Sequence, residues 1–131
     1  MKRTLKLAAA ALGAALLVPA FATAAHADAS DCPESYFCLF YNSNEQGSHF
    51  VVSQSIPDLA GYTFNSPGNG QGQHVKNNAA SAVDNSCLTV WVYYNSNYSG
   101  PSDMFNYHEA ANLDNTYNEN ASVKYAIPFC G

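Results

Sequence analysis

The chain has 131 residues and a formal charge of −5, and three of its five basic residues lie within the first six positions. From residue 28 onward two basic residues stand against ten acidic ones, so this part carries a formal charge of −8. Binding to nucleic acid or to an anionic membrane surface needs clustered lysine and arginine, so we expect neither partner.

The first 27 residues have the pattern of a secretory signal peptide. Lys2, Arg3 and Lys6 give a positive start, an apolar run extends to Val18, and Ala25-His26-Ala27 is an A-x-A cleavage signal. Because the apolar run is shorter than the roughly 20 residues of a membrane-spanning helix, we expect cleavage after Ala27 rather than anchoring. Ala22-Thr23-Ala24 and Ala27-Asp28-Ala29 fit the same cleavage pattern. The sequence therefore predicts a signal peptide over 1–27 and one secreted domain over 28–131, without membrane contact after cleavage.

Four cysteines, all within 28–131, indicate two disulfides in an exported chain of this size. They are Cys32, Cys38, Cys87 and Cys130, and three pairings are possible. We favour Cys32–Cys38 with Cys87–Cys130, because the first two cysteines are near enough in sequence to close a local ring. The spacings do not resemble those of a zinc site, whose ligands come in closely spaced pairs.

The first element of the domain is a predicted hairpin, and it occurs twice. The β-rich runs 36–41 and 88–94 are each followed by the same turn sequence, Asn-Ser-Asn-x-x-Gly. Second strands are predicted at 48–53 and 102–107. The match is too long to arise by chance, so the sequence contains an internal repeat.

Each copy of the repeat closes with a further strand, near 79–83 in the first and 121–127 in the second. About eight short strands separated by turn signals, with no helical period, indicate an antiparallel sandwich. We therefore predict an all-β domain of two Greek keys, at about 36–85 and 88–127.

The first copy carries an extra loop at 66–74, whose bounds follow from aligning Phe64-Asn65 with Tyr117-Asn118. Its glycines do not form a phosphate cradle, because the Lys-Ser/Thr ending and the following helix are missing. Binding residues often lie on loops held by a rigid scaffold, which makes Asn69, Gln71 and Gln73 candidate contacts with a partner. The glycines predict a flexible loop, which weighs against that role.

The second copy contains Tyr94, Tyr98 and Gly100 in the spacing Tyr-x-x-x-Tyr-x-Gly, with Ser122 downstream, and this resembles the Greek-key motif of βγ-crystallins. The first copy departs from the motif, with Glu45 at the position of the second aromatic residue. Across 28–131 the chain resembles the βγ-crystallin-like peptidase inhibitors typified by the Streptomyces metalloproteinase inhibitor. That likeness is carried by Cys32-Pro33, Cys38, both Tyr-Asn-Ser-Asn turns, residues 68–73 and residues 75–81.

The resemblance implies a βγ-crystallin-like double Greek-key sandwich stapled by disulfides. It also implies a secreted, monomeric inhibitor that is not an enzyme and that occludes the active site of an extracellular protease, a metalloprotease by analogy. The loop between Cys32 and Cys38 is a candidate for that contact through Pro33, Glu34 and Ser35.

The segment Asn77-Asn78-Ala79-Ala80-Ser81-Ala82 is close to the calcium-binding pattern of βγ-crystallins. Calcium takes about six to eight hard oxygen ligands, and the side chains of Asn77 and Ser81 and the carbonyl of Ala79 would supply some of them. The other interpretation is that Ser81 and Ser122 only hold turns by bonding the backbone. An inhibitor requires no cofactor, and calcium is the one candidate.

Two further functions stay open at this point: a calcium-binding structural crystallin domain, and a killer-toxin-like secreted antimicrobial protein of the same fold. Catalysis has no support in the sequence. His49, His74 and His108 lie in no His-Glu-x-x-His motif and beside no Gly-x-Ser-x-Gly turn.

Overall fold

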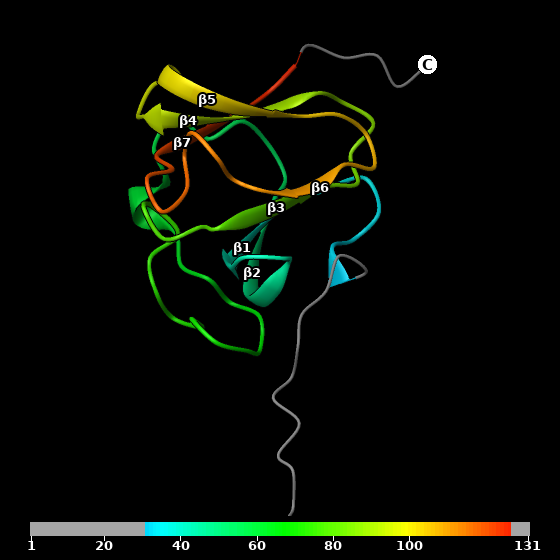
Figure 1. The fold of residues 1–131 in the computed structure, drawn as a ribbon, viewed down its shortest axis with the longest axis vertical. Helices are drawn as coiled ribbons and strands as arrows, with labels where there is room; N and C mark the ends of the chain where they lie inside the picture. The colour runs from blue at the N-terminus through cyan, green and yellow to red at the C-terminus, as the bar shows by residue number, and fades with distance from the viewer. Residues whose placement is uncertain (1–30, 127–131) are drawn as a thin grey trace, which may run out of the picture.

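The computed structural model describes residues 31–126 (Figure 1). The predicted signal peptide over 1–27 and Cys130 lie outside the described residues. Within the described range the chain is almost entirely strands and loops, with a 3₁₀ helix, η2, at Leu59–Gly61. This confirms the predicted all-β class. No helix of the described part is long and apolar enough to cross a membrane.

The strands form two antiparallel sheets, which lie one above the other in Figure 1. In chain order they are β1 (Phe37–Asn42), β2 (Gln46–Val52), β3 (Ser81–Asp84), β4 (Val90–Asn95), β5 (Ser99–Phe105), β6 (Ala110–Asn112) and β7 (Ser122–Tyr125). One sheet has the order β2-β1-β3-β6, and the other has the order β5-β4-β7. Both predicted hairpins are present, as β1–β2 and β4–β5.

The two copies of the repeat form two halves of the molecule, the first with β1 to β3 and the second with β4 to β7. In each half, the segment that follows the hairpin pairs with the sheet of the other half. β6 pairs with β3, and in the first half Ile56 forms a bridge with Val123 of β7. The bridge at Ile56 stands where an eighth strand is expected. Ile56 and Val123 exchange two backbone hydrogen bonds, and the next bond to this segment of the chain comes from the N–H of Leu59 to the carbonyl of Ala121.

The core lies between the two sheets. Its largest buried side chains are Phe37, Phe64, Phe105, Leu39 and Leu59. The rings of Phe37 and Phe105, one from each sheet, meet edge to face with centroids 5.4 Å apart. A smaller cluster of Cys32, Cys38, Phe40 and Val83 packs on the other face of β1 and β3. The disulfide thus covers a sheet face that would otherwise expose apolar side chains.

The extra loop of the first half is longer than the range 66–74 that the alignment of the two repeat copies predicts. The N–H of Leu59 donates to the carbonyl of Ala121, and the N–H of Leu113 donates to that of Ala80, both at 2.9 Å, so the two leucines are equivalent. Asn77 and Asn118 are also equivalent, with φ of 64° and 53°. Phe64-Asn65 therefore has no counterpart in Tyr117-Asn118, and the insertion spans about 63–74.

Candidate functional site

The disulfide between Cys32 and Cys38 is present, with the two Cα atoms 5.8 Å apart. It closes the predicted local ring at the start of β1. Cys87 is also disulfide-bonded. Its expected partner, Cys130, lies outside the described residues, so that pairing stays a prediction.

Asn85, which follows β3, makes three hydrogen bonds with the ring. The N–H of Ser35 donates to its carbonyl at 3.0 Å, its own N–H donates to the carbonyl of Tyr36 at 3.0 Å, and its Nδ2 donates to the carbonyl of Cys32 at 2.7 Å. Ser35 has a φ of 75°, a conformation that a serine keeps only when its surroundings enforce it. No sequence motif marks Asn85, so sequence reasoning missed it.

The predicted contact residues Pro33, Glu34 and Ser35 lie together at the exposed tip of this ring. Beside them is a hollow of about 470 Å³, whose walls include Pro33, Glu34, Asn85 and His108. Tyr107, 55% exposed, packs against His108 with ring centroids 3.7 Å apart and the ring planes tilted by 41°. The ring tip and His108 thus flank one depression on the surface.

The loop that carries His108 is held by Asp84, a buried carboxyl that sequence reasoning did not single out. The backbone carbonyl of Asp84 accepts from the N–H of His108 at 2.7 Å. Its Oδ1 accepts from the N–H and Oγ of Ser86 at 2.9 and 2.6 Å, and its buried Oδ2 has no partner in the described part of the chain. Burial raises the pKa of Asp84 to about 6.

The insertion is tied to the β1–β2 hairpin, although its glycines predict flexibility. The N–H of Ser48 donates to the carbonyl of Asn69 at 2.8 Å, and Asn69 Nδ2 donates to Asn42 Oδ1 at 3.2 Å. Gly70 lies against the ring of Tyr41, where an added Cβ would be 2.1 Å from the nearest ring atom. Neighbouring packing therefore fixes the loop.

The other candidate contacts, Asn69, Gln71 and Gln73, are exposed on this insertion. They do not join the ring. The ring closes at the start of β1, whereas the insertion packs at the opposite end of that strand, beside Asn42, and Figure 1 shows the two segments apart. The sequence-predicted contacts thus form two separate surfaces.

The segment proposed for calcium forms a tight turn. Ser81 is fully buried, and its Oγ donates to the carbonyl of Asn42 at 2.6 Å and accepts from the N–H of Glu45 at 2.9 Å. The carbonyl of Ala79 accepts from the N–H of Asn118 at 2.9 Å. Asn77 alone is exposed. These bonds favour the turn-holding role of Ser81, and calcium binding stays a prediction.

In the described residues no three His, Cys, Asp or Glu side chains gather as a metal site would need. Ser122 repeats the role of Ser81 in the second half. Its Oγ donates to the carbonyl of Asn95 at 2.7 Å and accepts from the N–H of Tyr98 at 3.1 Å. Glu45 and Tyr98 have φ of 56° and 58°, so the corner keeps its backbone shape despite the departure of Glu45 from the motif.

The sequence profile of peptidase inhibitor family I36 matches residues 25–105. The match includes the ring, the insertion and strands β1 to β5. No curated protein sequence is similar enough to this chain to count as a relative.

Several solved structures share the fold at low sequence identity. A structure from work on the evolution of the eye lens βγ-crystallin domain fold has a TM-score of 0.60 and 12% identity, and it covers 75% of this chain and 92% of its own. A βγ-crystallin from Ciona intestinalis has a TM-score of 0.53 and 20% identity, covering 70% and 99%. A βγ-crystallin domain from Clostridium beijerinckii has a TM-score of 0.52 and 17% identity, covering 69% and 95%. These likenesses confirm the predicted βγ-crystallin-like fold.

Proposed function

Because this chain belongs to peptidase inhibitor family I36, we propose that it blocks the active-site cleft of an extracellular metalloprotease with the Cys32–Cys38 ring. The family makes the chain a peptidase inhibitor, which is not an enzyme and whose partner is a protease. The target class follows from the resemblance to the Streptomyces metalloproteinase inhibitor. The geometry of the ring supports its assignment as the contact surface.

The rigidity of the ring carries this proposal. A loop that enters a protease cleft must be ordered beforehand, since each flexible side chain that binding immobilises costs about 0.5–1.5 kcal/mol. The disulfide and the three hydrogen bonds of Asn85 fix the backbone of the ring. Pro33 and Ser35 at the exposed tip have little rotamer freedom to lose.

The insertion is the weaker candidate for the protease contact. Its backbone is also held, but its exposed tip presents Gln71 and Gln73, whose long side chains lose more entropy on binding. The ring further offers Glu34, an exposed carboxylate. Catalytic zinc accepts Asp or Glu oxygen ligands, so a carboxylate at the tip suits a metalloprotease better than a serine protease.

The test is an inhibition assay with the exported protein, purified from the medium of cells that express the full chain. N-terminal sequencing of that protein checks the predicted cleavage after Ala27. We expect inhibition of zinc proteases and none of subtilisin-type serine proteases. Asn85→Ala, which loosens the ring without breaking the disulfide, should weaken inhibition, and Glu34→Gln should weaken it for zinc proteases.

A double variant in the insertion, Gln71→Ala with Gln73→Ala, is the matched control and should inhibit like the parent protein. Circular dichroism confirms that each variant is folded. If the insertion variant loses inhibition and the ring variants keep it, the contact surface is wrong. If the folded parent protein inhibits no protease of either class at micromolar concentration, the proposed target and mechanism fail together.

A further inference from the structure

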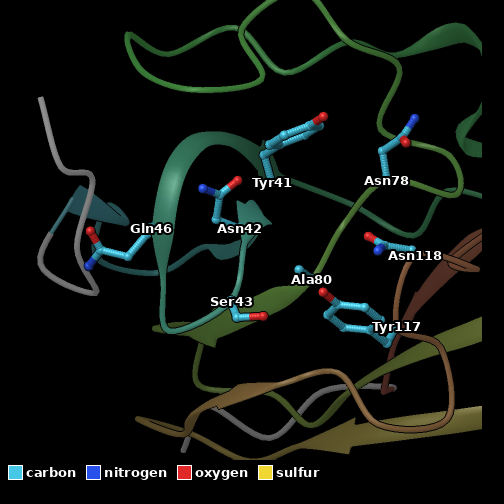
Figure 2. Close-up of a pocket in the computed structure, with 8 residues that line it drawn as sticks. All are labelled: Tyr41, Asn42, Ser43, Gln46, Asn78, Ala80, Tyr117 and Asn118. Carbon is cyan, nitrogen blue, oxygen red and sulfur yellow. The ribbon is translucent and has the colours of Figure 1, made fainter. Parts of the chain in front are cut away.

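A second, larger hollow of about 680 Å³ opens where the two halves of the molecule meet (Figure 2). One wall comes from the turn between β1 and β2, with Tyr41, Asn42 and Ser43. Asn78 lines a second side, and Tyr117 and Asn118 of the other half line a third. None of the ring or insertion residues proposed as protease contacts lines this hollow.

Every side chain that lines the hollow is uncharged. The polar groups are hydroxyls and carboxamides, which together offer both donors and acceptors. An ionic ligand would have to leave water without an opposite charge to pair with, which is costly. A purely apolar ligand would leave the polar groups unpaired. The lining therefore suits a neutral ligand that is rich in hydrogen-bonding groups.

Several of these polar groups are unused by the fold. The hydroxyls of Tyr41, Ser43 and Tyr117 and the carboxamide of Asn118 make no hydrogen bond with other described residues. Figure 2 shows the Asn118 carboxamide between the two tyrosine rings and the Ser43 hydroxyl directed toward the side of Tyr117. These groups are free to bond a ligand.

Other groups of the lining are fixed in place before any ligand arrives. Asn78 Nδ2 donates to the carbonyl of His74 at 2.9 Å, which sets the orientation of its carboxamide. Tyr41 meets Phe64 edge to face, with centroids 5.6 Å apart, and its ring is backed by Gly70. Preorganised groups lower the entropic cost of binding.

The two tyrosines add apolar faces to this polar lining. Tyr117 is 47% exposed, although a tyrosine ring gains by covering its apolar body. A pyranose ring has C–H faces that stack on aromatic rings and a rim of hydroxyls that bond amides and hydroxyls. We propose that this hollow binds a neutral oligosaccharide.

The equivalent place in the second half is chemically different, so the site is single. Glu119 stands where the first half has Asn78, since Asn118 is equivalent to Asn77. A hydrogen bond to Glu119 raises the pKa of the Tyr94 hydroxyl, and Tyr94 is the counterpart of Tyr41. There a carboxylate stands beside the tyrosine hydroxyl, which removes the neutral lining.

The experiment measures binding of the exported protein to maltohexaose, cellohexaose, chitohexaose and, as a charged comparison, heparin by calorimetry, and to the insoluble polysaccharides that match the three neutral sugars by sedimentation. We expect one of these sugars to bind. Tyr117→Ala should weaken that binding by about tenfold, which corresponds to about 1.4 kcal/mol. Ser43→Ala should weaken it less. Raising the salt concentration should leave the affinity unchanged, because no charged side chain lines the hollow.

Tyr107→Ala is the matched control, since Tyr107 is an exposed tyrosine outside this hollow, and it should bind sugar like the parent protein. Tyr117→Ala should keep full protease inhibition, which separates this site from the proposed inhibitory ring. The proposal is overturned if no sugar binds at millimolar concentration, if Tyr107→Ala and Tyr117→Ala lose binding equally, or if only a charged polysaccharide such as heparin binds.

Discussion

The two halves of this molecule hold the same loop by different chemistry. Phe50 and Asp103 are equivalent, because they pair with the equivalent residues Leu39 and Val92. In the second half, Asp103 accepts four hydrogen bonds from the short loop 114–116. In the first half, Phe50 packs on Tyr62 with ring centroids 5.2 Å apart, and the insertion begins just after that contact.

This difference between an aromatic contact and a carboxylate explains why the first half can carry the insertion that supports the neutral hollow. A carboxylate that accepts several backbone N–H groups specifies one short loop, since an added residue would leave donors unpaired. An aromatic contact is not directional, so the chain beyond Tyr62 can extend into the insertion. The insertion in turn backs Tyr41, a wall of the neutral hollow. The second half keeps a compact loop and has no such wall.

Among the substitutions that test this comparison, we expect the largest loss of unfolding free energy from one at Gly70. In Gly70→Ala the new Cβ would lie 2.1 Å from the Tyr41 ring, and the φ of 87° is unfavourable for alanine. We expect a loss of about 3 kcal/mol in unfolding free energy, from overpacking and backbone strain together. The measurement is urea unfolding followed by circular dichroism.

Gly72→Ala is the control for this prediction. Gly72 has a similar φ of 86°, but no atom lies within 4 Å of its added Cβ. It should lose only the backbone part, about 1 kcal/mol. Equal losses in the two variants would mean that the insertion is not packed on Tyr41.

A smaller loss is expected in the second half from Asp103→Ala. It removes the acceptor of four hydrogen bonds, but only Thr116 among the donor residues is buried, so water satisfies the others. We expect a loss of about 2 kcal/mol, with Asp103→Asn losing less because one acceptor oxygen remains. Proteolysis should cut Asp103→Ala within 114–116 and leave the insertion intact. Cleavage in the insertion instead would contradict the assignment of this carboxylate to the second half.

The serine corners should respond alike in both halves. Ser81→Ala and Ser122→Ala each remove a buried hydroxyl with two backbone partners, and each should cost about 1.5 kcal/mol by thermal unfolding. A calcium titration separates the two roles of Ser81. If calcium raises the melting temperature of the parent and of Ser122→Ala but not of Ser81→Ala, then Ser81 is a ligand as well as a corner residue.

The parts of the structure that local sequence determines were predictable. The repeated Asn-Ser-Asn-x-x-Gly turn identified both hairpins, and the short separation of Cys32 and Cys38 identified the ring. Asn85 and Asp103 were not predictable, because each acts on residues distant in sequence and neither belongs to a motif. The extent of the insertion was missed because Phe64-Asn65 resembles Tyr117-Asn118 by composition alone. A single sequence cannot separate such a match from structural equivalence.

The smallest expected effect concerns the ends of the last strands, β3 and β7, where the halves again differ. Asp84 and Tyr125 are equivalent, each three residues after a corner serine, and burial raises both pKa values, to about 6 and about 12. Tyr125 uses its hydroxyl to bond Phe37 and Val52, whereas one oxygen of Asp84 is buried without a partner among the described residues.

The Asp84 carboxyl should therefore give the fold a pH dependence between about pH 4 and pH 7, whereas Tyr125 titrates only at alkaline pH. Because the pKa of Asp84 is about 6 in the folded protein and 3.8 as its ordinary value, the folded state binds more protons between these values. Stability from this group is then complete below about pH 4 and is lost as pH rises through about 6. We expect a loss of about 1 kcal/mol, less than the full shift implies, because local relaxation and water penetration reduce the cost of a buried charge. Asp84→Asn keeps the acceptor oxygen for Ser86 and removes the charge, so its unfolding free energy should fall less than that of the parent protein between pH 4 and pH 7. If urea unfolding gives the same decrease for both proteins, Asp84 is not the group that titrates.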